Sequence, residues 1–147
     1  MRRLSDFVPA PHFRSFGGVK LTYRSRLSAE DRHPCSRRAV FRAEAHGPGG
    51  GEHGTQCVVK FADRYGRRAH GFMYERGVAA RPMYCEEVPS GRGLFAVVTE
   101  YVEHNPDAVP STEGMEKLTK ALAELHDQEK LILGDFRMPN VLLDSSG

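Results

Sequence analysis

The sequence TQCVVKF, residues 55–61, is the most informative short stretch of the chain. Its β-branched residues Val58 and Val59 favour a strand, and Lys60 follows them inside the same apolar run. An ammonium group in such a strand costs free energy unless an anion, such as a carboxylate or a phosphate, pairs with it. The stretch therefore predicts a buried strand in which one lysine meets an anion.

On either side of this strand, the sequence predicts an antiparallel sheet with one inserted helix. The glycine-rich residues 46–54 join the strand to the one before it, as in a hairpin. A helix is expected over 63–79, where apolar residues recur at helical spacing and Gly77 can end it. This order of elements gives an α+β fold with a five-stranded antiparallel sheet. The predicted strands are 19–24, 39–43, 55–61, 82–88 and 94–101.

The N-terminal part of the chain is basic. Residues 1–42 contain ten Lys and Arg against three Asp and Glu, whereas residues 43–147 contain eleven against sixteen. Residues 1–18 hold two prolines and a Gly-Gly pair, so we expect an irregular N-terminal arm. A basic arm can bind nucleic acid by releasing counterions, but its attachment to the acidic remainder of the chain is the simpler interpretation.

The composition favours a folded chain in a reducing compartment. Of the 147 residues, 39% are hydrophobic and 27% charged. The longest apolar run, residues 94–98, is far shorter than the roughly 20 residues of a membrane helix, and the N-terminus has no signal-type apolar stretch. Cys35, Cys57 and Cys85 are too few and too widely spaced for a disulfide framework. We therefore expect a cytoplasmic protein with no membrane segment.

A second helix is predicted over 111–126. Ser111 is suited to cap its N-terminus. Leu118, Leu122 and Leu125 repeat along one face, and burial of each leucine is worth about 1.5–3 kcal/mol. Such a face needs cover. Either the preceding part of the chain folds back over it, or a protein partner or a second copy of the chain covers it, or the helix is marginal.

The segment GDFRMPN, residues 134–140, carries polar groups suited to phosphoryl transfer. Asp135 precedes Asn140 by five residues, ahead of a short apolar run. In a turning loop, the carboxylate of Asp135 would meet a hydroxyl group, while the amide oxygen of Asn140 would meet a divalent cation. Arg137, between them, would neutralise a transferring phosphoryl group. The spacing therefore favours phosphotransfer chemistry.

In chain order, these motifs resemble the protein-kinase-like superfamily over about residues 19–147. VVKF (58–61) stands where kinases have V-A-I-K, and VVTEYVE (97–103) resembles the fifth strand and hinge. The catalytic loop of kinases and the residues around it resemble LHDQEKLILGDFRMPNVLLD (125–144). The motif within this segment is most similar to the H-G-D-x-x-x-x-N motif of aminoglycoside-phosphotransferase-like, choline-kinase-like and fungal kinase-like proteins. YGRRAHGFMYERGVAARPMYC (65–85) is similar to the helix and fourth strand of the fungal group.

The resemblance implies ATP and Mg²⁺ as cofactors. It implies a kinase-like small lobe over 19–103 and the start of a large lobe over 104–147, with the second helix and a catalytic loop at 133–140. Asp135 would be the catalytic base and Asn140 a magnesium ligand.

The resemblance also assigns a nucleotide site to the small lobe. Lys60 would hold the α- and β-phosphates, with Glu75 as the residue that orients it. The hinge backbone from Glu100 to Val102 would bind the adenine.

The chain also departs from the kinase pattern. No glycine occurs between Leu21 and Phe41, where the phosphate-covering loop belongs. Leu133 replaces the usual histidine of the catalytic triplet, and the sequence given stops at Gly147, before a D-F-G motif and the rest of the large lobe. We therefore expect a fragment of phosphotransferase ancestry that is catalytically incomplete as given. The alternatives are a pseudokinase-type protein-binding module and a nucleic-acid-binding protein that uses its basic arm.

Overall fold

The structure is a computed structural model that describes residues 13–27, 40–48, 53–89, 93–104 and 107–132. The chain divides into two compact units. The first comprises residues 1–65 and 82–101, and the second comprises residues 66–81 and 102–147. Each unit is described by itself below. Among the described residues, no helix has the length and apolar character needed to cross a membrane.

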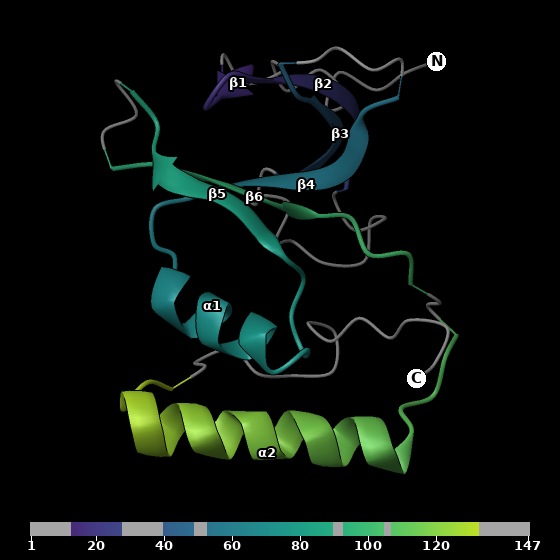
Figure 1. The fold of residues 1–147 in the computed structure, drawn as a ribbon, viewed down its shortest axis with the longest axis vertical. Helices are drawn as coiled ribbons and strands as arrows, with labels where there is room; N and C mark the ends of the chain where they lie inside the picture. The colour runs from purple at the N-terminus through teal and green to yellow at the C-terminus, as the bar shows by residue number, and fades with distance from the viewer. Residues whose placement is uncertain (1–12, 28–39, 49–52, 90–92, 105–106, 133–147) are drawn as a thin grey trace. The chain divides into compact units, whose positions relative to one another are not determined.

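The first unit is a single antiparallel sheet (Figure 1). Its strand order is β1-β2-β3-β4-β6-β5, and all neighbouring strands run antiparallel. The predicted α+β class is confirmed. The hairpin of β3 and β4 across the glycine-rich connection is confirmed as well. The strands are β1 (Ser15–Phe16), β2 (Val19–Arg26), β3 (Val40–His46), β4 (Thr55–Ala62), β5 (Pro82–Glu87) and β6 (Phe95–Glu100).

The prediction of five strands was wrong, because the sheet has six. The additional strand, β1, lies in the segment that we expected to be irregular. Gly17 and Gly18 have φ angles of +50° and +79°, which form a tight turn that only glycine adopts at low cost. This turn folds Phe16 back onto Val19, so that β1 pairs with β2.

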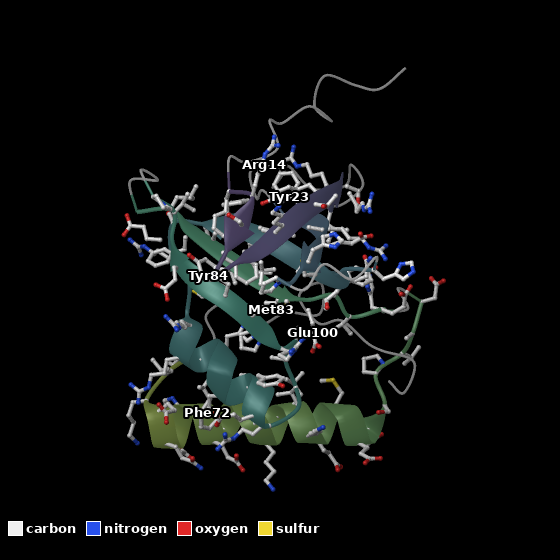
Figure 2. All side chains as sticks on the ribbon, turned by 45° about the horizontal axis from the view of Figure 1, so that its top comes forward. Arg14, Tyr23, Phe72, Met83, Tyr84 and Glu100 are labelled. Carbon is white, nitrogen blue, oxygen red and sulfur yellow. The ribbon has the colours of Figure 1, made fainter. Side chains whose placement is uncertain are left out.

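The sheet is strongly curled, and aromatic rings fill its inner face. β1 and β5 are the two edge strands of the sheet, yet the ring centroids of Phe16 and Tyr84 lie only 4.9 Å apart. The ring centroid of Phe13 lies 5.5 Å from that of Tyr84 and 6.4 Å from that of Phe16. Tyr84 and Tyr23 of the same sheet are labelled in Figure 2. The hydroxyl group of Tyr23 donates a hydrogen bond of 2.6 Å to the carbonyl oxygen of Phe13, which anchors the segment before β1.

The alternation of each strand places small residues on the inner face. Ala43 of β3, Cys57 and Val59 of β4, and Ala96 and Val98 of β6 are all fully buried there. Their small volumes let the curled strands approach one another beneath the aromatic cluster. Because side chains alternate along a strand, the intervening residues of β3 and β4 project from the opposite face, which carries the polar groups described below.

The second unit contains two helices, α1 (Arg67–Glu75) and α2 (Thr112–Glu129). The first is shorter than the predicted 63–79. It ends at Glu75, and Gly77 is the stop signal that was expected: its φ is +68° and its N–H donates to the carbonyl oxygen of Tyr74, while the N–H of Val78 donates to that of Met73. This pair of hydrogen bonds is a Schellman motif.

The second helix begins where the sequence indicated, and the hydroxyl oxygen of Ser111 accepts a hydrogen bond from the backbone N–H of Gly114. It extends three residues beyond the predicted end at 126 and stops at Lys130, whose φ is +55°. The last turn is polar, so apolar periodicity could not reveal it.

The two helices share a small apolar core. Leu125 and Ala121 of α2 are buried in one cluster with Phe72 and Met73 of α1. Leu118 and Leu122 are half-buried at the margin of this cluster. Part of the apolar face of α2 is therefore covered by α1.

Arg76 links the two helices by polar contacts. Its Nε donates to Oε2 of Glu124 at 2.7 Å, and its Nη2 donates to the side-chain oxygen of Gln128 at 3.3 Å. Its guanidinium carbon lies 3.3 Å from the centre of the Phe72 ring. A single arginine thus joins the end of α1 to the last two turns of α2.

Candidate functional site

Lys60 lies in the middle of the sheet, on its outer face. The register places it directly opposite Val40 of β3 and Val97 of β6, and Val97 lies opposite Cys85 of β5. Directly opposed residues project to the same side of a sheet, so these four side chains form one row. Lys60 is half-buried and Val97 is only 2% exposed. The predicted lysine within an apolar strand is present, with aliphatic neighbours on both sides.

The ring of Tyr65 provides an aromatic partner for Lys60. Tyr65 follows β4 in the connection to α1, and its ring centroid lies 5.7 Å from Nζ of Lys60. Burial, and to a lesser degree the nearby Cys85, raise the pKa of the Tyr65 hydroxyl to about 12. The ring therefore remains neutral across the physiological pH range and attracts the ammonium group through its π-face.

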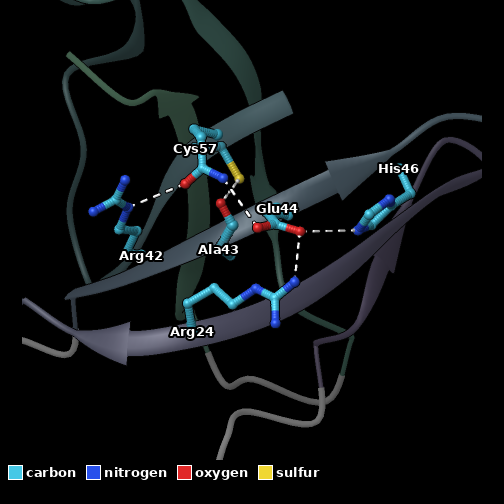
Figure 3. A network of polar contacts seen from close by, with 7 residues as sticks. Arg24, Arg42, Ala43, Glu44, His46 and Cys57 are labelled. Atoms are coloured by element: carbon cyan, nitrogen blue, oxygen red, sulfur yellow. Dashed lines mark hydrogen bonds and ion pairs between the residues drawn. The ribbon is translucent and has the colours of Figure 1, made fainter. Parts of the chain in front are cut away.

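A chain of hydrogen bonds crosses the outer face of β2, β3 and β4 (Figure 3). Nε of Arg42 donates to Gln56 at 3.1 Å, and the amide of Gln56 donates to Oε1 of Glu44 at 3.0 Å. Nη2 of Arg24 donates to Oε2 of Glu44 at 2.7 Å, and Nε2 of His46 lies 3.6 Å from the same oxygen. The Arg24 guanidinium and the Gln56 amide lower the pKa of the Glu44 carboxyl group. Glu44 is thus a carboxylate held in place by three neighbours.

The predicted hinge follows directly from β6. Glu100 is the last residue of that strand, and both it and Val102 are half-buried. The backbone N–H of Tyr101 donates to the carbonyl oxygen of Gln56 at 3.0 Å, which extends the pairing with β4 by one residue. The guanidinium carbon of Arg42 lies 4.2 Å from the centre of the Tyr101 ring. The polar network and the end of β6 therefore meet at Arg42.

Glu75 lies in the second unit, in the last turn of α1. Its side chain is 75% exposed, and Nη1 of Arg76 lies 4.0 Å from its carboxylate. It lines an open cavity of about 480 Å³ on the two helices, together with Phe72 and the ion-paired residues Arg68 and Glu129. The contacts described for Lys60 and for Glu75 belong to different units, so the expected pairing of the two stays a prediction.

The predicted catalytic loop lies outside the described residues. Asp135, Arg137 and Asn140 all belong to this part of the chain, and their roles stay predictions. Within the described ranges, no group of three or more His, Cys, Asp and Glu residues is arranged to hold a metal ion.

Two features of the outer face were missed by sequence reasoning. The alternating polar residues of β3, at positions 42, 44 and 46, are a signal that could have revealed the network. Tyr65 gives no such signal, because it follows the strand in an irregular connection and only the folded chain brings it over Lys60.

Comparison of the chain with protein-family models, with curated proteins and with solved structures gave no match in any of the three.

Proposed function

We propose that this chain is a protein-kinase-like domain that binds the phosphates of ATP, with Mg²⁺, at Lys60. The observation that carries the proposal is the position of this lysine. A half-buried ammonium group lies between two valines on the outer face of the sheet. A charge in this environment is stabilised by an anion, and phosphate oxygens are suitable partners.

The order of the elements supports the same proposal. In a kinase-like small lobe, the strand that carries the lysine is followed by a helix and two strands, the second of which pairs with the lysine strand and leads into the hinge. The chain has β4, α1, β5 and β6 in this order, and β6 pairs with β4. Glu100, Tyr101 and Val102 then follow β6 as the segment expected to bind the adenine.

Phosphoryl transfer is the second part of the proposal. By resemblance, Asp135 would take the proton of an acceptor hydroxyl group, Arg137 would neutralise the transferring phosphoryl group and Asn140 would bind Mg²⁺. If the chain transfers phosphate, the substitution Asp135→Asn is expected to abolish the transfer while nucleotide binding persists.

Isothermal titration calorimetry of the full chain with MgATP tests the binding proposal. We expect saturable binding that Lys60→Met weakens by at least about tenfold, the usual effect of losing a charge-assisted hydrogen bond. Lys20→Met is the matched control, because Lys20 is an exposed lysine of the same sheet. Equal affinity of the wild type and Lys60→Met, or no binding by a folded wild type, would contradict the proposal.

A further inference from the structure

We propose that Tyr65 is a positioning residue for Lys60, and that its ring face holds the ammonium group in the place where the phosphates would bind. The contact between the two residues is independent of any ligand. Its use in nucleotide binding rests on the proposed function.

The geometry of the pair supports the proposal. Nζ of Lys60 lies 5.7 Å from the centre of the Tyr65 ring, within the roughly 6 Å over which a cation is attracted to an aromatic face. Both residues are half-buried, so water screens the attraction less than it would at an exposed site. Only four residues separate them in the chain, so the short connection after β4 keeps the ring close to the lysine.

The phenol ring orients the ammonium group of Lys60 through its π-face and adds no negative charge of its own beside it. The phenol remains neutral because burial, with Cys85 nearby, raises its pKa to about 12. The other titratable side chain that the sheet register places in the row of Lys60 is Cys85, and Arg42 belongs to the neighbouring row on the same face.

The contact can be measured directly, because the sequence has only five lysines: Lys20, Lys60, Lys117, Lys120 and Lys130. Reductive methylation with ¹³C-formaldehyde gives each lysine a dimethylammonium group, which keeps its charge and produces an NMR signal. Lys60→Arg identifies the Lys60 signal. A methyl group above an aromatic ring is shifted upfield, so we expect the Lys60 signal upfield of the other four.

Two substitutions separate the ring from the hydroxyl group. In Tyr65→Phe the upfield shift should persist, whereas in Tyr65→Leu the Lys60 signal should move to the position of the other lysines. Tyr74→Leu is the matched control, since it removes an exposed tyrosine of α1. Circular dichroism establishes that each variant is folded, and Tyr65→Met replaces Tyr65→Leu if the latter does not fold.

A second experiment measures the affinity of the same variants for MgATP. Loss of the ring should weaken binding by about three- to tenfold in Tyr65→Leu, and Tyr65→Phe should restore it to within about twofold of the wild type. A purely structural role of Tyr65 would lower the melting temperature of Tyr65→Leu but leave the affinity of its folded form unchanged, which would overturn the proposal.

The NMR and affinity experiments together distinguish failure of the Tyr65 proposal from failure of the proposed function. A Lys60 signal without an upfield shift in the wild type, or one that Tyr65→Leu does not move, overturns the proposal that Tyr65 holds the ammonium group. A shift that Tyr65→Leu abolishes, in a chain that does not bind MgATP, supports the contact and overturns the proposed function instead.

Discussion

Cys57 couples the stability of the sheet to alkaline pH. Its thiol is fully buried and lies 3.4 Å from the carbonyl oxygen of Ala43, to which it donates. Burial raises its pKa from the ordinary 9.0 to about 11. Because the unfolded chain loses this proton first, the free energy of unfolding should fall as the pH rises from 9 to 11, by at most about 1.4 kcal/mol per pH unit for one proton.

Urea denaturation at several pH values between 8 and 11 measures this slope. Cys57→Ala should show a shallower slope, although its smaller side chain also lowers the stability at neutral pH. Val59→Ala removes packing from the same strand without removing a titratable group, so it should keep the slope of the wild type. A slope in Cys57→Ala as steep as that of the wild type would assign the alkaline dependence to other groups.

Glu44 should make the free energy of unfolding depend on pH in the acidic range, where stability falls as the pH falls. The hydrogen bond from Arg24, with that from Gln56, holds the pKa of the Glu44 carboxyl group below its ordinary value of 4.5. Its contribution is therefore complete above the unfolded pKa and is lost as the pH falls through the lower, folded pKa.

In Glu44→Gln, we expect reduced stability at pH 7 and a difference from the wild type that shrinks as the pH falls below about 4.5. Thermal melts across this range measure the difference. Glu116→Gln, at an exposed position of α2, controls for the removal of one negative charge. A difference that stays constant down to pH 3 would exclude the ionised carboxylate as its source.

At the scale of single elements, the pairing of β1 depends on the turn at Gly17 and Gly18. Their positive φ angles cost an L-residue about 1–2 kcal/mol each. Neither glycine has a close neighbour that an added Cβ would strike, so the expected cost comes from the backbone and not from packing.

We therefore expect Gly17→Ala to lower the free energy of unfolding by about 1 kcal/mol. Gly47→Ala is the matched control, since Gly47 also has open space around it and its φ is not positive. Equal losses in both variants, measured by urea denaturation, would show that the turn geometry is not responsible.

Besides the apolar core, we expect Arg76 to stabilise the pairing of α1 with α2. Its three contacts, with Glu124, Gln128 and the Phe72 ring, predict that Arg76→Ala lowers the free energy of unfolding by about 1–3 kcal/mol. Arg68→Ala breaks only an ion pair whose arginine side chain is 71% exposed, so its cost should stay below about 1 kcal/mol. Equal costs, measured by chemical denaturation, would rule out Arg76 as the main link between the helices.

The sequence predicted helices and strands well where the residue pattern agrees with the backbone conformation that the position requires. Periodic apolar residues located both helices, and Ser111 and Gly77 act as the predicted start and stop signals. The extra strand β1 was missed because a Gly-Gly pair is equally typical of a loop and of a hairpin turn. The last turn of α2 was missed because its polar residues pair with Arg68 of α1 and with Arg76, which follows α1, and no local pattern reveals these pairs.

At the scale of the whole molecule, the sequence could predict which residues have the chemistry of a site but not their neighbours. The place of Lys60 within an apolar strand followed from a few residues. The network around Glu44 depends on the register, which brings together residues from several strands. The contact with Tyr65 depends on the path of the short connection after β4. The predicted roles of Asp135 and Asn140 stay predictions, because both residues lie outside the described part of the chain.

The central claim is that Lys60 and the pair Asp135 and Asn140 act on one nucleotide. Titration of the ¹⁵N-labelled chain with MnATP tests it most directly, because paramagnetic Mn²⁺ broadens only the NMR signals of amides near the bound metal ion. We predict that the amide signals of residues 59–61 broaden together with those of residues 135–138 and 140, at the same low ratio of MnATP to protein. Broadening of one group without the other, or of neither, would contradict the account.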